Sequence, residues 1–239
     1  MDPSLPPSRP PLVFVRDLDH PELTADDHHH LERVLRVREG DEITIADGAG
    51  RWVPATFSST PVVSASAITA PESQPAITVG FALVKGGRPE LIVQKLTELG
   101  IDSIVIFEAE RSVARWDAAK AARNLTRLQR VAREASMQCR RPRLPVIVGP
   151  LTFDEAASLP GAVGTDRGGE APDLAHPTIL IGPEGGWTEA ERNRLGHLMR
   201  LGDNVLRAET AAITGAVALT LLRSGALRPA AGEPEEPEG

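Results

Sequence analysis

Strand-like and helix-like segments alternate along the chain after residue 75, and this alternation constrains the fold most strongly. Short apolar runs rich in Val and Ile predict strands at 76–83, 101–109, 145–149, 178–181 and 204–206. Helical patterns occur at 89–100, 116–138, 152–159, 188–195 and 212–227. Because parallel strands need such crossover helices, the sequence predicts an α/β fold with a mostly parallel sheet covered on both faces.

The region before residue 72 has a different pattern. Its short β-rich runs lie at 12–15, 42–47, 52–57 and 62–68. Gly-containing turns separate these runs and one helical segment, 26–37, interrupts them, so we expect a small β-barrel or sheet. A Pro- and Ser-containing stretch at 69–76 is typical of a linker. The sequence therefore predicts two domains, 1–72 and 73–228, followed by a disordered acidic tail at 229–239.

Composition excludes several classes of protein. The chain has a single cysteine, Cys139, which excludes an internal disulfide framework and indicates a reducing compartment. Residues 1–14 do not have the basic and apolar segments of a signal peptide, and no run of about 18 apolar residues predicts a transmembrane helix. We expect a cytoplasmic protein without a membrane partner.

The net charge of −7 is distributed unevenly. Residues 1–72 have a net charge of −6, whereas 111–143 contain 10 Lys and Arg against two acids. Apolar side chains at 125, 128, 132 and 135 predict an amphipathic helix, which Pro142 and Pro145 end. The basic face of this helix indicates phosphate binding, and a merely solvated charged face is the alternative.

A glycine-rich loop, Gly182-Pro183-Glu184-Gly185-Gly186, follows the predicted strand 178–181. Ligands of parallel sheets bind at the carboxyl ends of strands. The loop matches neither a Walker motif nor a dinucleotide fingerprint. Thr188 and Glu191 have the spacing of a capping box, which uses amides that a phosphate would need. A neutral or cationic ligand fits the loop better, and a purely structural tight turn is the alternative.

Six dispersed motifs together resemble one family, the RsmE-type 16S rRNA uridine methyltransferases of the SPOUT superfamily. In chain order they are HHLERVLRVREGDEITIADG (29–48), IVQKLTELGI (92–101), ERSV (110–113), QCRRPRLP (138–145), LIGPEGG (180–186) and LGDNVLRAETA (201–211). The resemblance covers nearly the whole chain. It departs at Asp203-Asn204, where many relatives have Pro-Arg, and this change removes a positive charge near a cofactor loop.

The resemblance implies a PUA-like RNA-binding β-barrel and a SPOUT-type α/β domain with a trefoil knot. It implies that the knot loops bind S-adenosylmethionine in a bent form, with S-adenosylhomocysteine as the product. It also implies a homodimer, in which the partner chain completes each site, acting on 16S rRNA in the small ribosomal subunit. No metal is expected, since the adjacent histidines at 28–30 point different ways on a helix.

Site residues follow from matching these motifs and from the distribution of charge. The expected cofactor contacts are Leu180, Ile181, Gly182, Pro183, Glu184, Gly185, Gly186, Leu201, Gly202, Val205, Leu206, Arg207, Thr210 and Ala211. The expected RNA contacts are His30, Arg33, Arg36, Lys85, Arg88, Lys95, Arg123, Arg127, Arg130, Gln138, Arg140, Arg141 and Arg143. For His30, Arg33 and Arg36 on the predicted helix 26–37, the alternative to RNA contact is an ordinary surface position.

Methylation at N3 of uridine requires loss of the N3 proton, so a general base or a donor to the uracil oxygens would help. Arg111 and Arg207 are candidates for stabilising the uracil anion. Glu209 is a candidate base, with pairing or helix capping as the alternative role. Glu184 is a further candidate, and a turn-stabilising role is its alternative.

Three other functions remain open at this stage. A related knotted enzyme methylates the ribose 2′-hydroxyl, and the pocket chemistry alone allows it. A non-catalytic rRNA-binding assembly factor would have the same RNA surface without donor binding. A nucleotide-dependent enzyme is disfavoured by the absence of a phosphate-loop motif.

Overall fold

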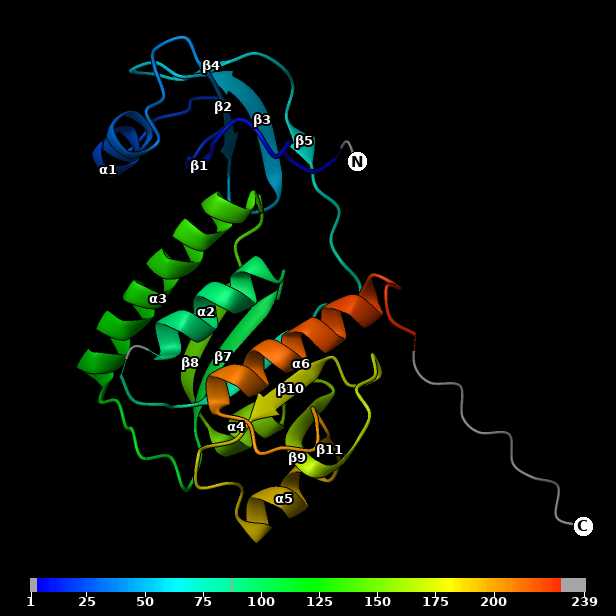
Figure 1. The fold of residues 1–239 in the computed structure, drawn as a ribbon. Helices are drawn as coiled ribbons and strands as arrows, with labels where there is room; N and C mark the ends of the chain where they lie inside the picture. Colours follow the sequence, from blue (N-terminus) through cyan, green and yellow to red (C-terminus); the bar gives the residue numbers. More distant parts are fainter. Residues whose placement is uncertain (1–3, 87, 229–239) are drawn as a thin grey trace, which may run out of the picture.

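The computed structural model describes residues 4–86 and 88–228. Two separate β-sheets organise this part of the chain (Figure 1). The predicted tail at 229–239 lies outside the described residues, so it stays a prediction.

The smaller sheet belongs to the N-terminal part of the chain and has the order β1-β2-β3-β4, with β5 also paired to β3. Its strands are β1 (Leu12–Phe14), β2 (Glu42–Ala46), β3 (Arg51–Thr56), β4 (Val62–Val63) and β5 (Ile68–Thr69). β1 and β2 are parallel and the other pairs antiparallel. Leu31, Ile43 and Ile45 are fully buried beneath it.

Two predictions for this part are corrected. The helix expected at 26–37 is α1 (Ala25–His29) followed by a π-helical turn, His30–Val34, and it is over by Leu35. The strand expected at 62–68 is divided into β4 and β5, because the intervening Ala65-Ser66-Ala67 leaves the ladder. Small and polar residues of this kind favour a turn over continued pairing.

The larger sheet has the order β11-β9-β10-β6-β7-β8, and all its neighbouring strands are parallel. Its strands are β6 (Thr78–Ala82), β7 (Ser103–Glu108), β8 (Val146–Thr152), β9 (Ala162–Glu170), β10 (Thr178–Ile181) and β11 (Leu198–Met199). Its helices are α2 (Arg88–Glu98), α3 (Ala118–Cys139), α4 (Phe153–Ala157), α5 (Glu189–Leu195) and α6 (Ala208–Arg223). The predicted parallel α/β fold is confirmed.

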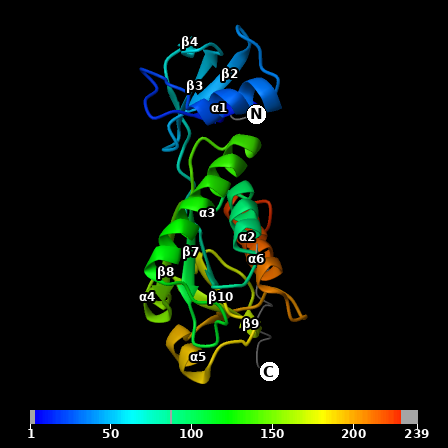
Figure 2. The ribbon, with the colours of Figure 1, turned by 90° about the vertical axis from the view of Figure 1, so that its left-hand side faces the viewer.

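Helices cover both faces of this sheet (Figures 1 and 2). Each face has its own hydrophobic core. On one face α2, α3 and α6 bury a large cluster that includes Phe81, Ile92 and Leu128. On the other face α4 and α5 bury a smaller cluster built on Phe107 and Trp187. Successive side chains along a strand point to opposite faces of the sheet. Neighbouring residues of β6 and β7 therefore belong to different clusters.

Three features of the larger sheet differ from the sequence prediction. The two-residue β11 was not predicted. β9 was not predicted, because AVGTDRGGE contains three glycines and a charged pair and has weak strand propensity. Pairing to β10 and β11 on its two sides nevertheless holds it extended. The expected strand at 204–206 is wrong: residues 200–207 form no strand, and the glycine and turn-forming residues at 202–204 break the pattern. The trefoil knot and the domain boundary at residue 72 stay predictions.

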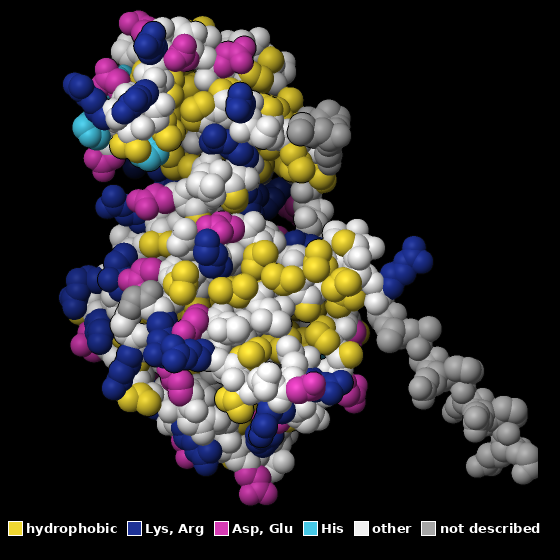
Figure 3. All heavy atoms as spheres, in the orientation of Figure 1, with side chains coloured by type: hydrophobic (Ala, Val, Ile, Leu, Met, Phe, Trp, Pro, Cys, Tyr) yellow, Lys and Arg dark blue, Asp and Glu magenta, His cyan; other side chains and the backbone are white. Residues whose placement is uncertain are grey.

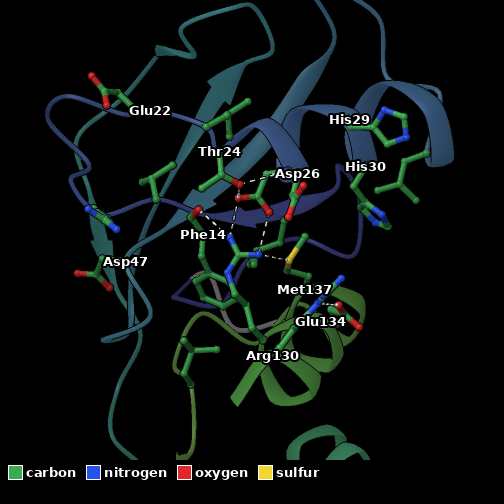
Figure 4. Close-up of a pocket in the computed structure, with 18 of the residues that line it drawn as sticks. Phe14, Glu22, Thr24, Asp26, His29, His30, Asp47, Arg130, Glu134 and Met137 are labelled. Atoms are coloured by element: carbon green, nitrogen blue, oxygen red, sulfur yellow. Dashed lines mark hydrogen bonds and ion pairs between the residues drawn. The ribbon is translucent and has the colours of Figure 1, made fainter. Parts of the chain in front are cut away.

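The two parts of the chain meet where the C-terminal half of α3 reaches the N-terminal part and contacts β1 (Figure 2). The Arg133 guanidinium donates to both carboxylate oxygens of Asp27, at 2.7 and 2.8 Å, and to the carbonyl of Phe14. Asp27 also accepts from the Thr24 hydroxyl at 2.6 Å. Met137 packs into the core of the small sheet. A cavity of about 1330 Å³ surrounds this junction (Figure 4).

Replacing Arg133 tests whether this ion pair holds the two parts together. Arg133→Ala leaves Asp27, which is 4% exposed, as a buried unpaired carboxylate. We expect the free energy of unfolding to fall by about 2 kcal/mol in urea denaturation followed by circular dichroism. Arg130→Ala is the control, since Arg130 pairs with Glu134 on the exposed surface of the same helix and should cost less than about 0.5 kcal/mol. Equal losses in both variants would contradict this account.

Candidate functional site

The glycine loop lies at the carboxyl end of β10, whose four residues are all buried. Gly186 has φ of +70°, a conformation that favours glycine, and its N–H closes the turn on the Pro183 carbonyl at 2.8 Å. A Cβ added to Gly182 would lie 2.9 Å from the Trp187 indole, so a side chain is excluded there. The loop therefore exposes bare backbone at a strand end, as the sequence predicted.

Trp187 anchors this loop from inside the protein. Its indole is 4% exposed and stacks parallel to the Phe107 ring, with the ring centroids 6.1 Å apart. Its Nε1 donates to the carbonyl of Thr165 on β9 at 3.0 Å. This role was not predicted from the sequence. The available signal was an aromatic residue directly after two glycines, at a point where a flexible loop needs a buried attachment.

The predicted capping box at the start of α5 is confirmed. Thr188 Oγ1 accepts from the Glu191 N–H at 3.2 Å, and Glu191 Oε2 accepts from the Thr188 N–H at 2.9 Å. Arg192 on the same helix donates to Asp166 on β9 at 2.5 Å. Burial alone would raise the pKa of Asp166, but hydrogen bonds from Arg192 and from the Gly168 N–H outweigh it and lower that pKa.

The loop after β7 reaches the glycine loop. The Glu110 N–H donates to Glu191 Oε1 at 2.8 Å. Arg111 Nη1 donates to the carbonyls of Gly185 and Trp187, at 3.1 and 3.4 Å. Because β6 lies between β7 and β10 in the sheet, this loop must cross the carboxyl end of β6 to make these contacts. The structure thus brings Arg111 to the glycine loop.

The second predicted loop, 201–207, leads into α6, and the contacts of α6 place it at the same edge. Near the C-terminal end of α6, Arg223 donates to Asp102 and to the Gly100 carbonyl, both at the start of β7. Halfway along α6, a Cβ at Gly215 would overlap the Ile179 side chain of β10. α6 therefore runs antiparallel to the strands, and its N-terminus lies at their carboxyl ends, near the glycine loop (Figure 1).

Three residues at this N-terminus differ in their surroundings. Arg207 is exposed and is the N-cap of α6, but its side chain makes no capping hydrogen bond. Glu209 Oε2 is buried and has no hydrogen-bond partner within the described part of the chain. Val205 is 80% exposed, which is unusual for an apolar residue in a compact domain. Leu206 and Ala211 instead pack with the main core.

Most of the predicted RNA-binding side chains already have protein partners. Figure 3 shows Lys and Arg gathered along the edge formed by α3, whose predicted apolar face is buried. The ion pairs are Arg33–Glu32, Arg88–Glu184, Lys95–Glu98, Arg127–Glu90, Arg130–Glu134 and Arg143–Glu72. The exposed members of the set also include Arg36, Lys85, Arg123 and Gln138, whereas His30 is half-buried.

Arg140 and Arg141 follow α3 and have a structural role in this conformation. Arg140 is the left-handed C-cap, with φ of +62°, and donates to the Met137 carbonyl at 3.0 Å. Arg141 donates to the carbonyls of Ile101 and Thr97, at 2.7 and 3.3 Å, and its side chain is 13% exposed. Burial lowers the pKa of both guanidinium groups. Arg141 therefore has few donors left for a phosphate.

Comparison with known proteins gives consistent matches over both parts of the chain. The family model of the RNA methyltransferase domain matches residues 71–220, and that of the RNA methyltransferase PUA domain matches 23–60. Ribosomal RNA small subunit methyltransferase E of Mycobacterium tuberculosis (strain CDC 1551 / Oshkosh) is 31% identical over 84% of this chain and 86% of the relative. The Bacillus subtilis (strain 168) protein of the same name is 30% identical over 79% and 85%.

This chain belongs to the ribosomal RNA small subunit methyltransferase E family. A crystal structure of the Neisseria gonorrhoeae methyltransferase E bound to S-adenosyl methionine is also similar, with a TM-score of 0.76 and 27% sequence identity. The similarity covers 90% of this chain and 98% of that structure. The predicted family is confirmed, and with it the combination of a PUA domain and a methyltransferase domain.

One cluster outside this site has the residue types of a metal centre. Asp173, His176 and His197 have ligand atoms within 4.8 Å of one another. The two imidazole rings, however, stack nearly parallel, with centroids 4.4 Å apart and an angle of 10° between their planes. Ring-nitrogen lone pairs lie in the ring planes, so two parallel rings do not direct them at one ion. We assign no metal here. Among the described residues, no helix is long and apolar enough to cross a membrane.

Removing the Trp187 anchor should loosen the glycine loop and its surroundings. Trp187→Ala opens a cavity under the loop, and we expect a loss of about 3–5 kcal/mol in the free energy of unfolding, measured in urea. Trp187→Phe keeps most of the packing but leaves the Thr165 carbonyl without its donor. We expect this variant to lower the free energy of unfolding by about 1 kcal/mol. Trp116→Ala, at a half-buried position, is the control. If Trp187→Ala costs no more than this control, the anchor role is wrong.

Proposed function

We propose that this chain transfers a methyl group from S-adenosylmethionine to N3 of a uridine in the decoding region of 16S rRNA, within the small ribosomal subunit. The observation that carries the proposal is the convergence of two backbone loops, 182–187 and 201–207, at one edge of a parallel sheet. Their sequences are those of a family whose Neisseria gonorrhoeae member is bound to S-adenosyl methionine.

The two loops are suited to hold the donor through their main-chain atoms. A Cβ at Gly182 would overlap Trp187, and a Cβ at Gly185 would lie 3.1 Å from the Arg111 side chain, so the two glycines let these side chains pack directly on the main chain of the loop and hold its shape. We assign the donor to the backbone of 180–186 and 201–206 and to Arg207, Thr210 and Ala211. When bound there, S-adenosylmethionine supplies an activated methyl group with a neutral thioether leaving group. The protein mainly positions the reacting atoms.

Three side chains are assigned to the reaction. Glu209 is the proposed acceptor of the uridine N3 proton, because its Oε2 is buried at the loop edge without a hydrogen-bond partner among the described residues. Arg207 and Arg111 are proposed to stabilise the uracil anion. Glu184 pairs with Arg88 at 2.6 Å, which supports the loop-stabilising role for it rather than that of a base.

RNA recognition is assigned to the PUA domain and to α3. Lys and Arg gather along the edge formed by α3 (Figure 3). Arg130 of the same helix also lines the cavity between α3 and the small sheet (Figure 4). Few aromatic side chains are present, which favours recognition by charge and RNA shape with the target base turned out. We further propose a cytoplasmic homodimer. Two exposed leucines, Leu221 near the end of α6 and Leu227 beyond it, support an apolar interface.

The decisive assay is methyl transfer from labelled S-adenosylmethionine to small ribosomal subunits that lack the modification, with the product nucleoside identified by mass spectrometry. We expect N3-methyluridine. A ribose-methylated product would replace the proposed reaction with 2′-O-methylation. Donor binding without transfer to subunits or naked rRNA would indicate a different RNA, and no donor binding would leave a non-catalytic rRNA-binding protein.

Substitutions at the reaction edge test the residue roles in the same assay. Glu209→Gln should lower kcat by about 10² to 10⁴, the range for loss of a general base. Arg207→Ala should lower it by about 10² to 10³, the range for loss of one anion donor. Glu189→Gln is the control, since Glu189 is exposed in the first turn of α5 and should retain full activity. A Glu209→Gln variant as active as this control would overturn the proton-acceptor assignment.

A further inference from the structure

Glu191 is buried beside the proposed donor loop, although it lies outside the motifs that define the site. The residue is 5% exposed, and its carboxylate accepts hydrogen bonds from two segments far apart in sequence. Oε2 accepts from the Thr188 N–H and, at 3.3 Å, from the Thr188 hydroxyl. Oε1 accepts from the N–H of Glu110, 81 residues away. A capping box requires the bond from the Thr188 N–H but not the bond from the Glu110 N–H.

A second capping box in the same chain shows what capping alone looks like. At the start of α4, Glu155 Oε2 accepts from the N–H and hydroxyl of Thr152, both at 2.8 Å, and Glu155 N–H donates back to Thr152 at 3.2 Å. Glu155 is exposed and reaches no other segment in the described structure. The burial of Glu191 and its bond to Glu110 therefore go beyond what the cap of a short helix needs.

The bond to Glu110 fixes the residue directly before Arg111. Arg111 in turn donates to the carbonyls of Gly185 and Trp187, so the loop after β7 is held at two points, to Glu191 in the first turn of α5 and to the glycine loop. One point is the main chain at 110 and the other is the Arg111 side chain. Both lie above the end of β6, which separates β7 from β10. Two attachments fix the relative orientation of the loops, whereas one would leave a hinge.

We infer that Glu191 is a positioning residue for methyl transfer: it holds the 110–111 main chain so that Arg111 fixes the glycine loop in the shape that binds the donor. The inference rests on the proposed function in one respect, that the glycine loop binds S-adenosylmethionine. Glu191 itself contacts neither the donor nor the RNA base in this account, and its effect passes through Arg111.

A double-mutant cycle between Glu191 and Arg111 tests this coupling. The measurements are the Kd for S-adenosylmethionine by calorimetry, and kcat and KM in the methyl-transfer assay. Glu191→Gln and Arg111→Ala should each weaken donor binding by about tenfold, because misplaced loops lose oriented contacts. The double variant should bind the donor no more weakly than the weaker single variant, because Glu191 acts through Arg111 and has no further effect once that side chain is removed. Glu191→Ala serves as the stronger variant if it folds.

Thr188→Ala and Glu155→Ala are the matched controls. The first weakens the same cap but keeps Glu191 bonded to Glu110, and the second removes the equivalent carboxylate of α4. Each should change donor affinity less than twofold while lowering the melting temperature, as loss of a cap does. The inference is overturned if Glu191→Gln behaves like these controls. It is also overturned if the Kd of the double variant rises by the product of the two single-variant changes.

The wild-type chain separates the two possible failures. If the wild type binds the donor and transfers methyl groups but the Glu191 variants match the controls, only the positioning role is wrong. If the wild type does not bind the donor, the proposed function and the inference both fail.

Discussion

The parallel direction of all six strands in the larger sheet is the constraint on which the rest of the site depends. It places every strand's carboxyl end at one edge, so segments distant in sequence meet there. The loop after β7 and the glycine loop after β10 are bonded to each other across β6, and the antiparallel course of α6 returns residues 207–210 to the same edge. Trp187 then fixes the glycine loop to the sheet beneath it.

Local patterns predicted much of this arrangement. The β-branched runs of β6, β7 and β10, the amphipathic face of α3 and the Thr188–Glu191 capping box were all readable, since each depends on residues close in sequence. β9 was missed because its stability comes from neighbours on both sides rather than from its own residues. The false strand at 204–206 shows the converse, since Val205 and Leu206 are apolar but have no adjacent strand to pair with.

The candidate site was predictable in its loops but not in its contacts. Arg111 was identified from the ERSV motif, yet its bonds to Gly185 and Trp187 depend on the strand order, which local sequence does not encode. The contacts of the basic residues at 111–143 were likewise not predictable. The helix that carries most of them was predicted, but the fold uses Arg133 to hold the two domains together and Arg141 to support a buried turn. Ion partners decide which arginines remain for RNA, and the partners of Arg88, Arg127 and Arg143 lie far away in sequence.

A crystal structure of this chain with S-adenosylhomocysteine bound would show where the donor site lies. We expect the ligand in a bent form between loops 182–187 and 201–207, with its hydrogen bonds made mainly to main-chain atoms and with Trp187 unmoved beneath it. A ligand bound elsewhere, such as in the cavity between α3 and the small sheet, would show that the two loops are not the donor site.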